Sequence, residues 1–186
     1  YGASAINSST TLQVGSGGGT GSVGNGNISN NGTLAYNRTG TVTNTGAISG
    51  TGGLTVQGSG TVVLAADNSY SGNTTVTTGT LRVGAGGAAG SLGTAGFVTL
   101  ASGGTVAFNR SDATTNAPAI VGSGTLAQVG SGKTVITNDA NSYGVTAVSG
   151  GTLELGDGAN ASGLLGTNGI TLTTPGVLSF NRPDVY

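Results

Sequence analysis

Glycine interrupts this chain so often that no helix of ordinary length fits between the interruptions. Gly supplies 39 of the 186 residues, and each Gly inside a helix costs about 1 kcal/mol relative to Ala. Between the glycines stand short runs of Val, Leu and Thr, such as LTV, TVVL and TLRVG within residues 50–84. Each run is long enough for one half-buried strand and too short for a helix. The sequence therefore predicts an all-β chain of short strands and tight turns.

The chain also repeats itself over a long period. The segments GTLAYNRTG, GTVAFNRSD and GVLSFNRPD align without gaps, and their arginines, Arg38, Arg110 and Arg182, are spaced 72 positions apart. On this period the chain divides into a partial unit at 1–32, units at 33–104 and 105–176, and a partial unit at 177–186. Because it starts and stops inside a unit, we expect 1–186 to be a single β-solenoid segment of a longer repetitive protein.

A shorter rhythm runs inside each unit. Leu34 and Leu54 are 20 positions apart, as are Val42 and Val62. Coils of about 20 to 24 residues, with three short strands each, would stack at about 4.8 Å, so that about eight coils form a parallel β-helix on the order of 40 Å long. Ladders between coils pair the main chain, and each larger inward side chain adds roughly 1.5–3 kcal/mol.

Two alternatives to the solenoid stay open. A two-layer β-sandwich also uses short strands, although its strands are usually more aromatic, and only 4% of this chain is aromatic. Disorder is typical of Gly- and Ser-rich chains. Low-complexity linkers, however, do not keep Val and Leu runs in register over long distances, which favours the solenoid.

Charge and cysteine content limit the partners and the compartment. Charged residues make up 6% of the chain and only five residues are basic, which argues against a nucleic-acid surface. The chain has no Cys, and therefore no disulfide. No apolar run is long enough to span a membrane, and we expect any export signal to lie outside this piece. So little charge is unusual for a cytosolic protein and favours an extracellular one.

Three Gly-rich segments depart from the strand pattern. They are residues 15–26, 84–93 and 156–166, and each follows a TLxVG-like run. One interpretation is a floppy loop that leaves the coil at the same place in each unit. The other is a loop displayed for recognition, which solenoids often carry on one face. Both interpretations stay open.

Residues 52–84 resemble the passenger-associated repeat of bacterial autotransporters. The likeness rests on Leu54, on GTVVL at 60–64, on the NSYSG turn at 68–72 and on the closing GTLRVG at 79–84. A second copy at 122–156 keeps the first and last parts and reads NSYGV at the turn.

This resemblance implies a right-handed β-helical passenger, exported by an outer-membrane β-barrel that we expect on the C-terminal side of this fragment. Passengers of this kind serve as adhesins, as stalks for an effector domain, or less often as proteases and lipases. The repeat itself carries no catalytic residues, so the resemblance indicates architecture and export route more than activity.

No pattern in the chain points to catalysis. There is no His and no Cys, so the usual general base, thiolate nucleophile and transition-metal ligands are missing. Asp112 and Asp184 stand beside Arg110 and Arg182, which favours local ion pairs. No acid lies within two residues of another; the acids are Asp67, Asp112, Asp139, Glu154, Asp157 and Asp184. We predict no catalytic, cofactor-binding or metal-binding residue and no cofactor.

Three weaker patterns are also present. GDGA at 156–159 is a partial and unrepeated match to a calcium-binding repeat. Thr-x-Thr pairs at 41–43, 75–77 and 171–173 suggest an ice-binding array, but they do not fall on successive coils. An aromatic residue occupies one position of every unit, either as a sugar-stacking platform or, as we favour, in the core; these are Tyr36, Phe108 and Phe180.

We expect a secreted, non-enzymatic, structural and adhesive rod of an autotransporter passenger that extends from the bacterial cell surface. Its partners would be host-cell or matrix glycans or proteins, bound through repeated weak contacts. The alternative is the repeat subunit of a self-assembling extracellular fibre, because the open ends of a solenoid are unpaired strand edges and neither end carries an evident cap. A β-helical carbohydrate-active enzyme is the least favoured. Neither a nucleic-acid partner nor a membrane-spanning segment is expected.

Overall fold

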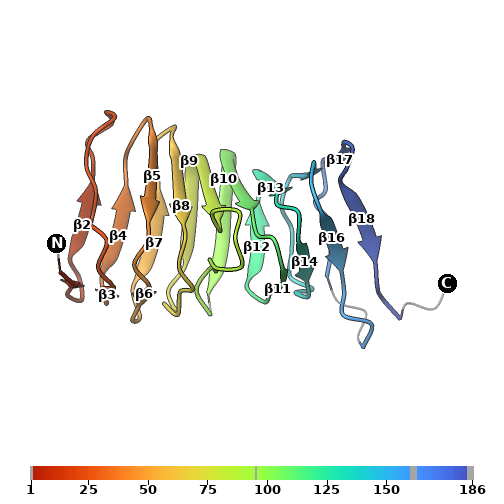
Figure 1. The fold of residues 1–186 in the computed structure, drawn as a ribbon, viewed down its shortest axis with the longest axis horizontal. Helices are drawn as coiled ribbons and strands as arrows, with labels where there is room; N and C mark the ends of the chain where they lie inside the picture. Colours follow the sequence, from red (N-terminus) through yellow and green to blue (C-terminus); the bar gives the residue numbers. More distant parts are fainter. Residues whose placement is uncertain (1, 95, 160–162, 184–186) are drawn as a thin grey trace.

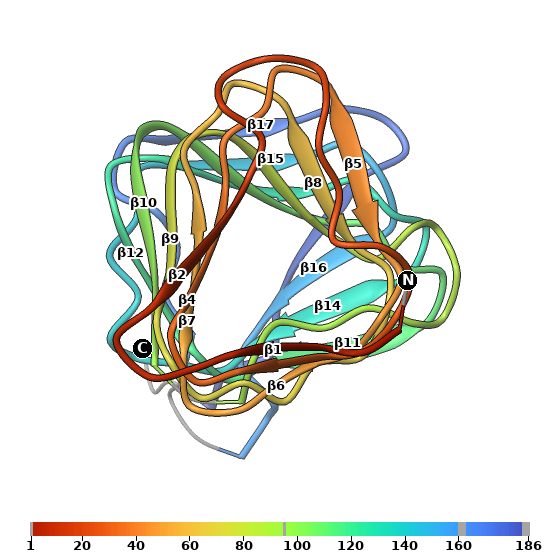
Figure 2. The same ribbon diagram turned by 90° about the vertical axis from the view of Figure 1, so that its left-hand side faces the viewer.

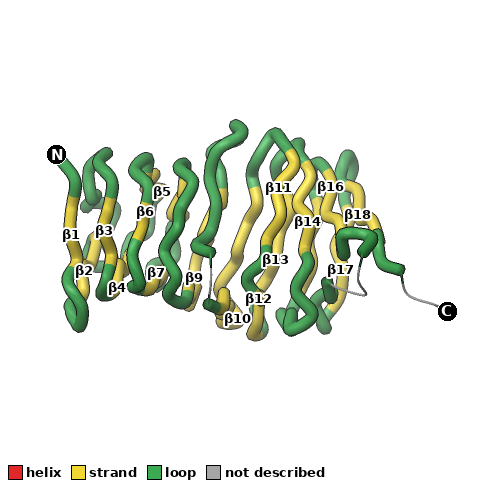
Figure 3. The backbone as a smooth tube through the Cα atoms, turned by 90° about the horizontal axis from the view of Figure 1, so that it is seen from below, coloured by secondary structure: helices red, strands yellow, loops and turns green. Residues whose placement is uncertain are grey.

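The chain forms a rod in which short strands lie side by side along the long axis (Figure 1). This computed structural model describes residues 2–94, 96–159 and 163–183, and within them it contains strands, turns and loops but no helix (Figure 3). Every strand pair recorded in this part of the chain is parallel, including the pairs β2–β4, β4–β7 and β13–β15. A chain whose strands all pair in parallel with the preceding and following coils is a β-solenoid, and the prediction of about eight coils is confirmed.

Three strand stacks make up the faces of the rod. Face 1 holds β1 (Ser4–Ile6), β3 (Ile28–Asn30), β6 (Ile48–Ser49), β11 (Ala113–Asn116), β14 (Lys133–Ile136), β16 (Thr152–Leu155) and β18 (Val177–Phe180). Face 2 holds β2 (Thr11–Val14), β4 (Thr33–Tyr36), β7 (Gly53–Val56), β12 (Ala119–Gly122) and the first halves of β9 (Thr74–Val83) and β10 (Phe97–Phe108). Face 3 holds β5 (Thr41–Asn44), β8 (Thr61–Leu64), β13 (Thr125–Gln128), β15 (Val145–Val148), β17 (Gly169–Leu172) and the second halves of β9 and β10.

The coil has a triangular cross-section when it is viewed along the rod (Figure 2). From the N-terminal end, the chain passes along face 1, then face 2, then face 3, and it turns clockwise as it recedes from the viewer. The solenoid is therefore right-handed, as parallel crossovers almost always are. β9 and β10 continue round the corner between faces 2 and 3, and this joins the two faces into one 11-stranded sheet.

Inward side chains stack in files from coil to coil, at the spacing seen in the sequence. Val42 pairs with Val62, which pairs with Leu81, and this file continues to Val106 and Leu126. All five are at most 6% exposed. Each coil thus removes its apolar side chains from water by covering those of the next, which is how small residues build a continuous core.

The Asn-x-Tyr turn lies against a strand of the preceding coil, since Ser69 donates to Ile48 of β6 and Ser142 donates to Ile120 of β12. The Asn68 side chain accepts a hydrogen bond from the main-chain N–H of Ile48 in the preceding coil at 2.8 Å. Two residues later, Tyr70 points into the core, where its hydroxyl lies 2.8 Å from the Thr74 hydroxyl. Burial raises the pKa of Tyr70 above its ordinary value. Asn141 and Tyr143 repeat this arrangement with Ile120 and Thr146, so the turn motif satisfies a strand N–H and fills the core at once.

The described residues contain no helix that could cross a membrane. The sandwich alternative is wrong, because the recorded strand pairs link successive coils of one solenoid.

Candidate functional site

Each Gly-rich segment leaves the coil as a small loop whose two ends touch. We name residues 15–21 the first arch, residues 84–90 the second arch, and the described residues 156–159 and 163 the third arch. In the second arch, a Cβ atom on Gly90 would lie only 2.5 Å from the main chain of Gly84. A Cβ on Gly21 would lie 2.8 Å from the nitrogen of Gly15, and one on Gly163 would lie 2.8 Å from that of Gly156. The base of each arch is therefore closed by a pair of glycines.

The first residue of each arch also needs glycine for its backbone conformation. The φ angles of Gly15, Gly84 and Gly156 are 83°, 90° and 83°, in the left-handed region that other residues avoid. The TLxVG motif that precedes each segment thus ends in Gly because the chain must turn out of the strand there.

Main-chain hydrogen bonds hold each arch against the coil that follows it. The N–H of Gly17 donates to the Asn37 carbonyl at 2.8 Å, and the N–H of Thr39 donates to the Gly18 carbonyl at 3.1 Å. The second and third arches repeat the first of these bonds at 2.8 Å, from Gly86 to Asn109 and from Gly158 to Asn181. The floppy-loop interpretation is wrong for the described parts of these segments, because they are hydrogen-bonded to the rod.

An arginine from the following coil holds each arch by donating hydrogen bonds to its carbonyl oxygens. We call this arginine with its hydrogen-bond partners the clasp of the arch. Arg38 donates to the carbonyls of Gly19 and Gly21. Arg110 donates to Ala88 at 2.5 Å and to Gly90 at 2.7 Å, and Arg182 donates to Gly163 at 2.6 Å. These are the three arginines of the long repeat, so the repeat couples an arch to its own clasp.

The clasp of the second arch uses the whole guanidinium group of its arginine. All five N–H groups of the Arg110 guanidinium donate, to Ala88, Gly90, Asp67 and both carboxylate oxygens of Asp112. The hydrogen bond with Arg110 lowers the pKa of Asp112, and it raises the pKa of Arg110. Arg110 is only 9% exposed, so this pairing compensates the cost of burying the cation.

An acid from the preceding coil contacts the second and third arches from the other side. The carboxylate of Asp67 accepts from the N–H of Gly90 at 2.9 Å, and that of Asp139 accepts from the N–H of Gly163 at 3.1 Å. Asp67 and Asp139 are separated by one full period of the long repeat. Each of these two arches is therefore fixed between an acid of the coil before it and an arginine of the coil after it.

The outer sides of the arches make few contacts and face solvent. Residues 16–22, 85–89 and 157–159 are exposed. A Cβ placed on Gly18, Gly19 or Gly87 would meet nothing within 4 Å. Because the contacts to the rod use main-chain atoms of the arch, the side chains at its tip are free to vary without loosening it.

Of the two predicted local ion pairs, that of Arg110 with Asp112 is confirmed, and a further pair joins Lys133 to Glu154 across successive coils. Arg110 contacts Asp112 at 2.9 Å, and Lys133 contacts Glu154 at 3.1 Å. Asp184 lies outside the described residues. Asp157, in the GDGA segment, accepts from the N–H of Ala159 at 3.0 Å, as in an ordinary local turn. Among the described residues, no three acids gather into a group that could hold a metal ion.

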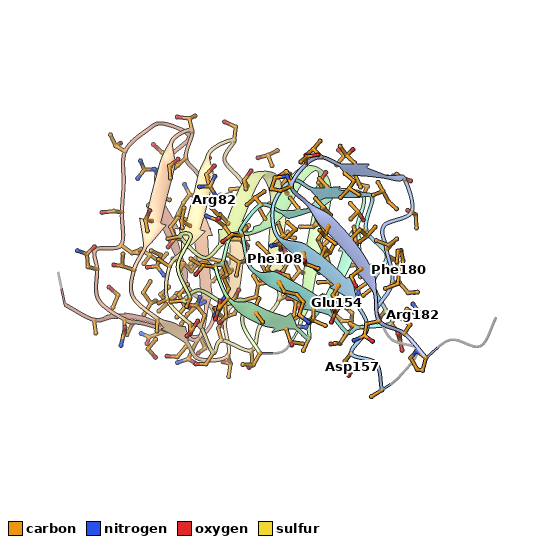
Figure 4. All side chains as sticks on the ribbon, turned by 45° about the vertical axis from the view of Figure 1, so that its right-hand side comes forward. Arg82, Phe108, Glu154, Asp157, Phe180 and Arg182 are labelled. Atoms are coloured by element: carbon orange, nitrogen blue, oxygen red, sulfur yellow. The ribbon has the colours of Figure 1, made fainter. Side chains whose placement is uncertain are left out.

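Two of the three aromatic residues at the shared position pack in the core. Tyr36 is 0% exposed and Phe108 is 2% exposed. Phe180 is 60% exposed, because it lies on β18 at the C-terminal end of the described rod, beside Arg182 (Figure 4). Packing in the core, the interpretation we favoured, is confirmed for the first two positions.

Face 3 carries a file of threonines that sequence reasoning did not find. Thr41, Thr61, Thr80, Thr105 and Thr125 pair in register on five successive coils. The file beside it reads Thr43, Val63, Arg82, Ala107 and Ala127, so the Thr-x-Thr pairs do not form a two-file array here. The signal in the sequence was the Gly-Thr dipeptide that opens each of these strands.

The clasp was also missed, although its parts were visible. The alignment identified the three arginines and the three Gly-rich segments separately. Arg38 lies about one coil further along the chain than Gly15, the first residue of its Gly-rich segment. Arg110 and Arg182 follow the first residues of the other two segments, Gly84 and Gly156, at a similar spacing. That spacing was the signal that an arginine lies over its segment once the coils are stacked.

Two shallow clefts lie near the ends of the described rod. One is lined by Ser4, Leu12, Gln13 and residues of the first arch, and the other by Val129, Thr152, Pro175 and Val177 with intervening Ser and Gly. Neither lining includes a titratable side chain. Neither cleft therefore offers acid–base chemistry.

Comparison with known families explains the turn and strand motifs. Residues 54–83 and 126–155 match the family described as passenger-associated-transport-repeat. Each match contains one Asn-x-Tyr turn and ends on the strand that leads into an arch. The chain thus carries two repeats of the passenger-associated type. The family resemblance noted from the sequence is thereby confirmed.

A curated relative supports the same assignment. The chain is 37% identical to the adhesin BmaC autotransporter of Brucella suis biovar 1 (strain 1330), in an alignment that covers 58% of this chain. The segment spans only 4% of the length of that relative. No solved structure matches it significantly.

Proposed function

We propose that this passenger segment is part of a secreted adhesive rod that extends from the bacterial cell surface. The observation that carries the proposal is the joining of a repeat of the passenger type with ordered, solvent-facing arches along a β-solenoid. The similarity to a protein named as an autotransporter adhesin supports the same function. Export would proceed through an outer-membrane β-barrel on the C-terminal side.

The mechanism is multivalent. Each arch exposes hydroxyls, methyl groups and main-chain amides at residues such as Ser16, Thr20 and Ala85, which offer weak contacts. Several weak contacts made by one rigid rod raise the effective concentration of every further contact, so the rod binds more tightly than any single arch. The ligands we propose are glycans or proteins of a host cell or matrix.

We propose that the rod works without catalysis. The clefts lack titratable side chains, and the acids among the described residues serve as partners of arginine and lysine or as acceptors for main-chain amides. Incubating the purified chain with polysaccharides and measuring released reducing sugar tests this point. Sugar release that scales with protein concentration would contradict it.

Adhesion is tested by comparing one copy with many. The 186-residue chain is coupled to beads at several densities, and bead attachment to host cells is counted against beads that carry bovine albumin. We expect attachment to rise more steeply than linearly with chain density, because the contacts are weak and cooperate. Attachment equal to that of albumin beads at every density would overturn the adhesive function.

A second candidate, end-to-end assembly, is supported by apolar side chains on the last described coil. Ile170, Leu172, Val177 and Phe180 are each 50–60% exposed. Further coils of the same chain or a second copy would bury them. Size-exclusion chromatography with negative-stain imaging distinguishes discrete short rods from filaments that lengthen with concentration.

A further inference from the structure

The repeat in the sequence and the turn of the solenoid have different lengths. Starting from Leu34 on face 2, the strand register leads to Leu54 after one turn, to Thr74 after two and to Val98 after three. The repeat equivalent of Leu34 is Val106, which stands eight positions beyond Val98. Eight residues therefore remain in each unit after three full turns.

Those eight residues carry the chain across one corner. Val106 is the repeat equivalent of Leu34, but it lies on face 3, where it pairs with Leu81 and Leu126. The next unit behaves in the same way. From Val106 the register runs through Leu126 and Thr146 to Ile170, and eight residues later Leu178 lies on face 1, paired with Leu153.

Each repeat therefore advances the chain by three turns and one face. Because the cross-section is a triangle (Figure 2), one face corresponds to a rotation of about 120° at an axial rise of roughly 16 Å for three and a third turns. Corresponding residues of successive units must lie at successive corners of the rod.

The arches follow this rotation. In Figure 2 the loop of the first arch stands at the top, that of the second at the right, and the described part of the third at the bottom. Their clasps rotate with them, because Arg38, Arg110 and Arg182 lie at the ends of strands on faces 2, 3 and 1. This chain therefore differs from the many solenoids that carry such loops on one face.

We propose that the rod has no single adhesive face and presents its arches along a screw, in three directions, to a partner that surrounds it. This rests on the proposed function, since it treats the arches as the binding elements. A flat rigid target touching one corner would meet equivalent arches only at every third unit, after ten turns or roughly 48 Å. A network of matrix polymer around the rod can contact an arch of every unit, and this is the partner that the arrangement fits.

The direction of the arches can be measured without any ligand. The chain has no Cys, so Gly18→Cys and Gly87→Cys place two unique thiols at the tips of the first and second arches, where an added side chain meets no atom within 4 Å. The thiols are biotinylated, streptavidin is bound, and the decorated full-length chain is imaged by electron microscopy. We expect the two streptavidins to diverge by about one third of a full rotation around the rod axis.

A matched pair on one corner provides the control. Ser102 is exposed in the turn of β10 between faces 2 and 3, at the same corner as the first arch. The Gly18→Cys, Ser102→Cys variant should carry both streptavidins on one side. Two arch labels on the same side, as in the control pair, would overturn the proposal. Because no ligand is involved, this outcome is independent of whether the chain adheres to cells.

Discussion

At the scale of single residues, the repeat places similar side chains in different surroundings. Tyr36 and Phe108 occupy the same position of the unit, and both are buried. The hydroxyl of Tyr36, however, has no hydrogen-bond partner, and burial raises its pKa above the ordinary value. Phe108 fills the equivalent place without a polar atom, so the repeat itself supplies the substitution that tests this site.

Tyr36→Phe should leave the free energy of unfolding unchanged or raise it by up to about 1 kcal/mol, because it removes a buried hydroxyl without a partner. Urea unfolding followed by circular dichroism measures this. Tyr70→Phe is the matched comparison, since it removes a hydroxyl that is bonded to Thr74, and it should lower the unfolding free energy by about 1 kcal/mol. A larger loss for Tyr36→Phe than for Tyr70→Phe would contradict this interpretation.

The first clasp lacks an acid that the second possesses. Arg110 pairs with Asp112, whereas the equivalent of Asp112 in the first unit is Gly40, and the Nε of Arg38 is buried without a partner. A Cβ on Gly40 would contact only the Arg38 guanidinium, at 4.0 Å. Gly40→Asp should therefore stabilise the chain by about 1 kcal/mol, partly through the new bond and partly by restricting the unfolded chain.

Thermal and urea unfolding check this prediction, and Gly40→Ala separates its two contributions. The Ala variant gains only the restriction of the unfolded chain. If Asp gives no more stability than Ala, the added carboxylate does not complete the clasp.

At the scale of elements, the strands and the arches are stabilised in different ways. Strands are paired on both sides by neighbouring coils and bury an apolar file. The arches bury almost nothing at their tips and depend on glycine geometry, main-chain bonds and one arginine each. Local opening should therefore begin at the arches, and it should respond to substitutions that leave the core intact.

Arg110→Met keeps an apolar stem and removes all five guanidinium bonds. We expect faster hydrogen exchange at the Gly90 amide and a loss of about 1–3 kcal/mol in the unfolding free energy, because charge-assisted bonds are lost. The Gly17 amide in the first arch is the control within the same molecule and should keep its protection. Equal exchange at Gly90 in the two proteins would mean that Arg110 does not hold the arch.

Acid should loosen the second clasp. The pKa of Asp112 is lowered by Arg110, so the pairing contributes stability above the ordinary Asp pKa of about 3.9, and this contribution is lost as the pH falls through the lowered value. Hydrogen exchange at Gly90, corrected for the intrinsic effect of pH, should therefore lose protection below about pH 4. Asp112→Asn should remove this part of the pH dependence, and an unaltered profile in that variant would exclude Asp112 as its source.

At the scale of the whole molecule, each coil contacts mainly the coil before and the coil after it. Such a rod behaves as a row of similar layers, and its stability is close to the sum of the layers and their interfaces. The register shows where a layer can be removed cleanly. Gly53 and Leu54 occupy the same file positions as residues 73 and 74 of the following coil, so 53–72 is one complete turn.

Deleting 53–72 should leave a folded rod that is one turn shorter, because Leu34 then stacks on Thr74 as Leu54 did. Circular dichroism should keep its strand signal, and the urea m-value should fall by roughly a tenth in proportion to the surface lost. Deleting only 53–62 is the control. It removes half a turn, so every later strand is displaced from the strand with which it pairs in the preceding coil. If both deletions fold equally well, the coil is not the unit of stability.

The sequence alone determined the architecture of this protein. Frequent glycines excluded helices, the regular spacing of Leu34 and Leu54 set the coil, and the Asn-x-Tyr and Gly-Thr-Leu motifs identified the passenger repeat. These are local or nearest-neighbour properties, because the strand and turn preferences of each coil depend on its own residues and on the coil stacked against it.

Only the tertiary structure decided where the repeated features lie around the rod. Whether Arg38 reaches an arch depends on how one coil lies over another, and no motif within either coil records that. The corner that an arch occupies depends on the mismatch between the long repeat, which runs from Leu34 to Val106, and three full turns, which run from Leu34 to Val98. That remainder of eight residues is the length of the repeat minus the lengths of three turns, and the turn lengths are known only when all the strands are paired.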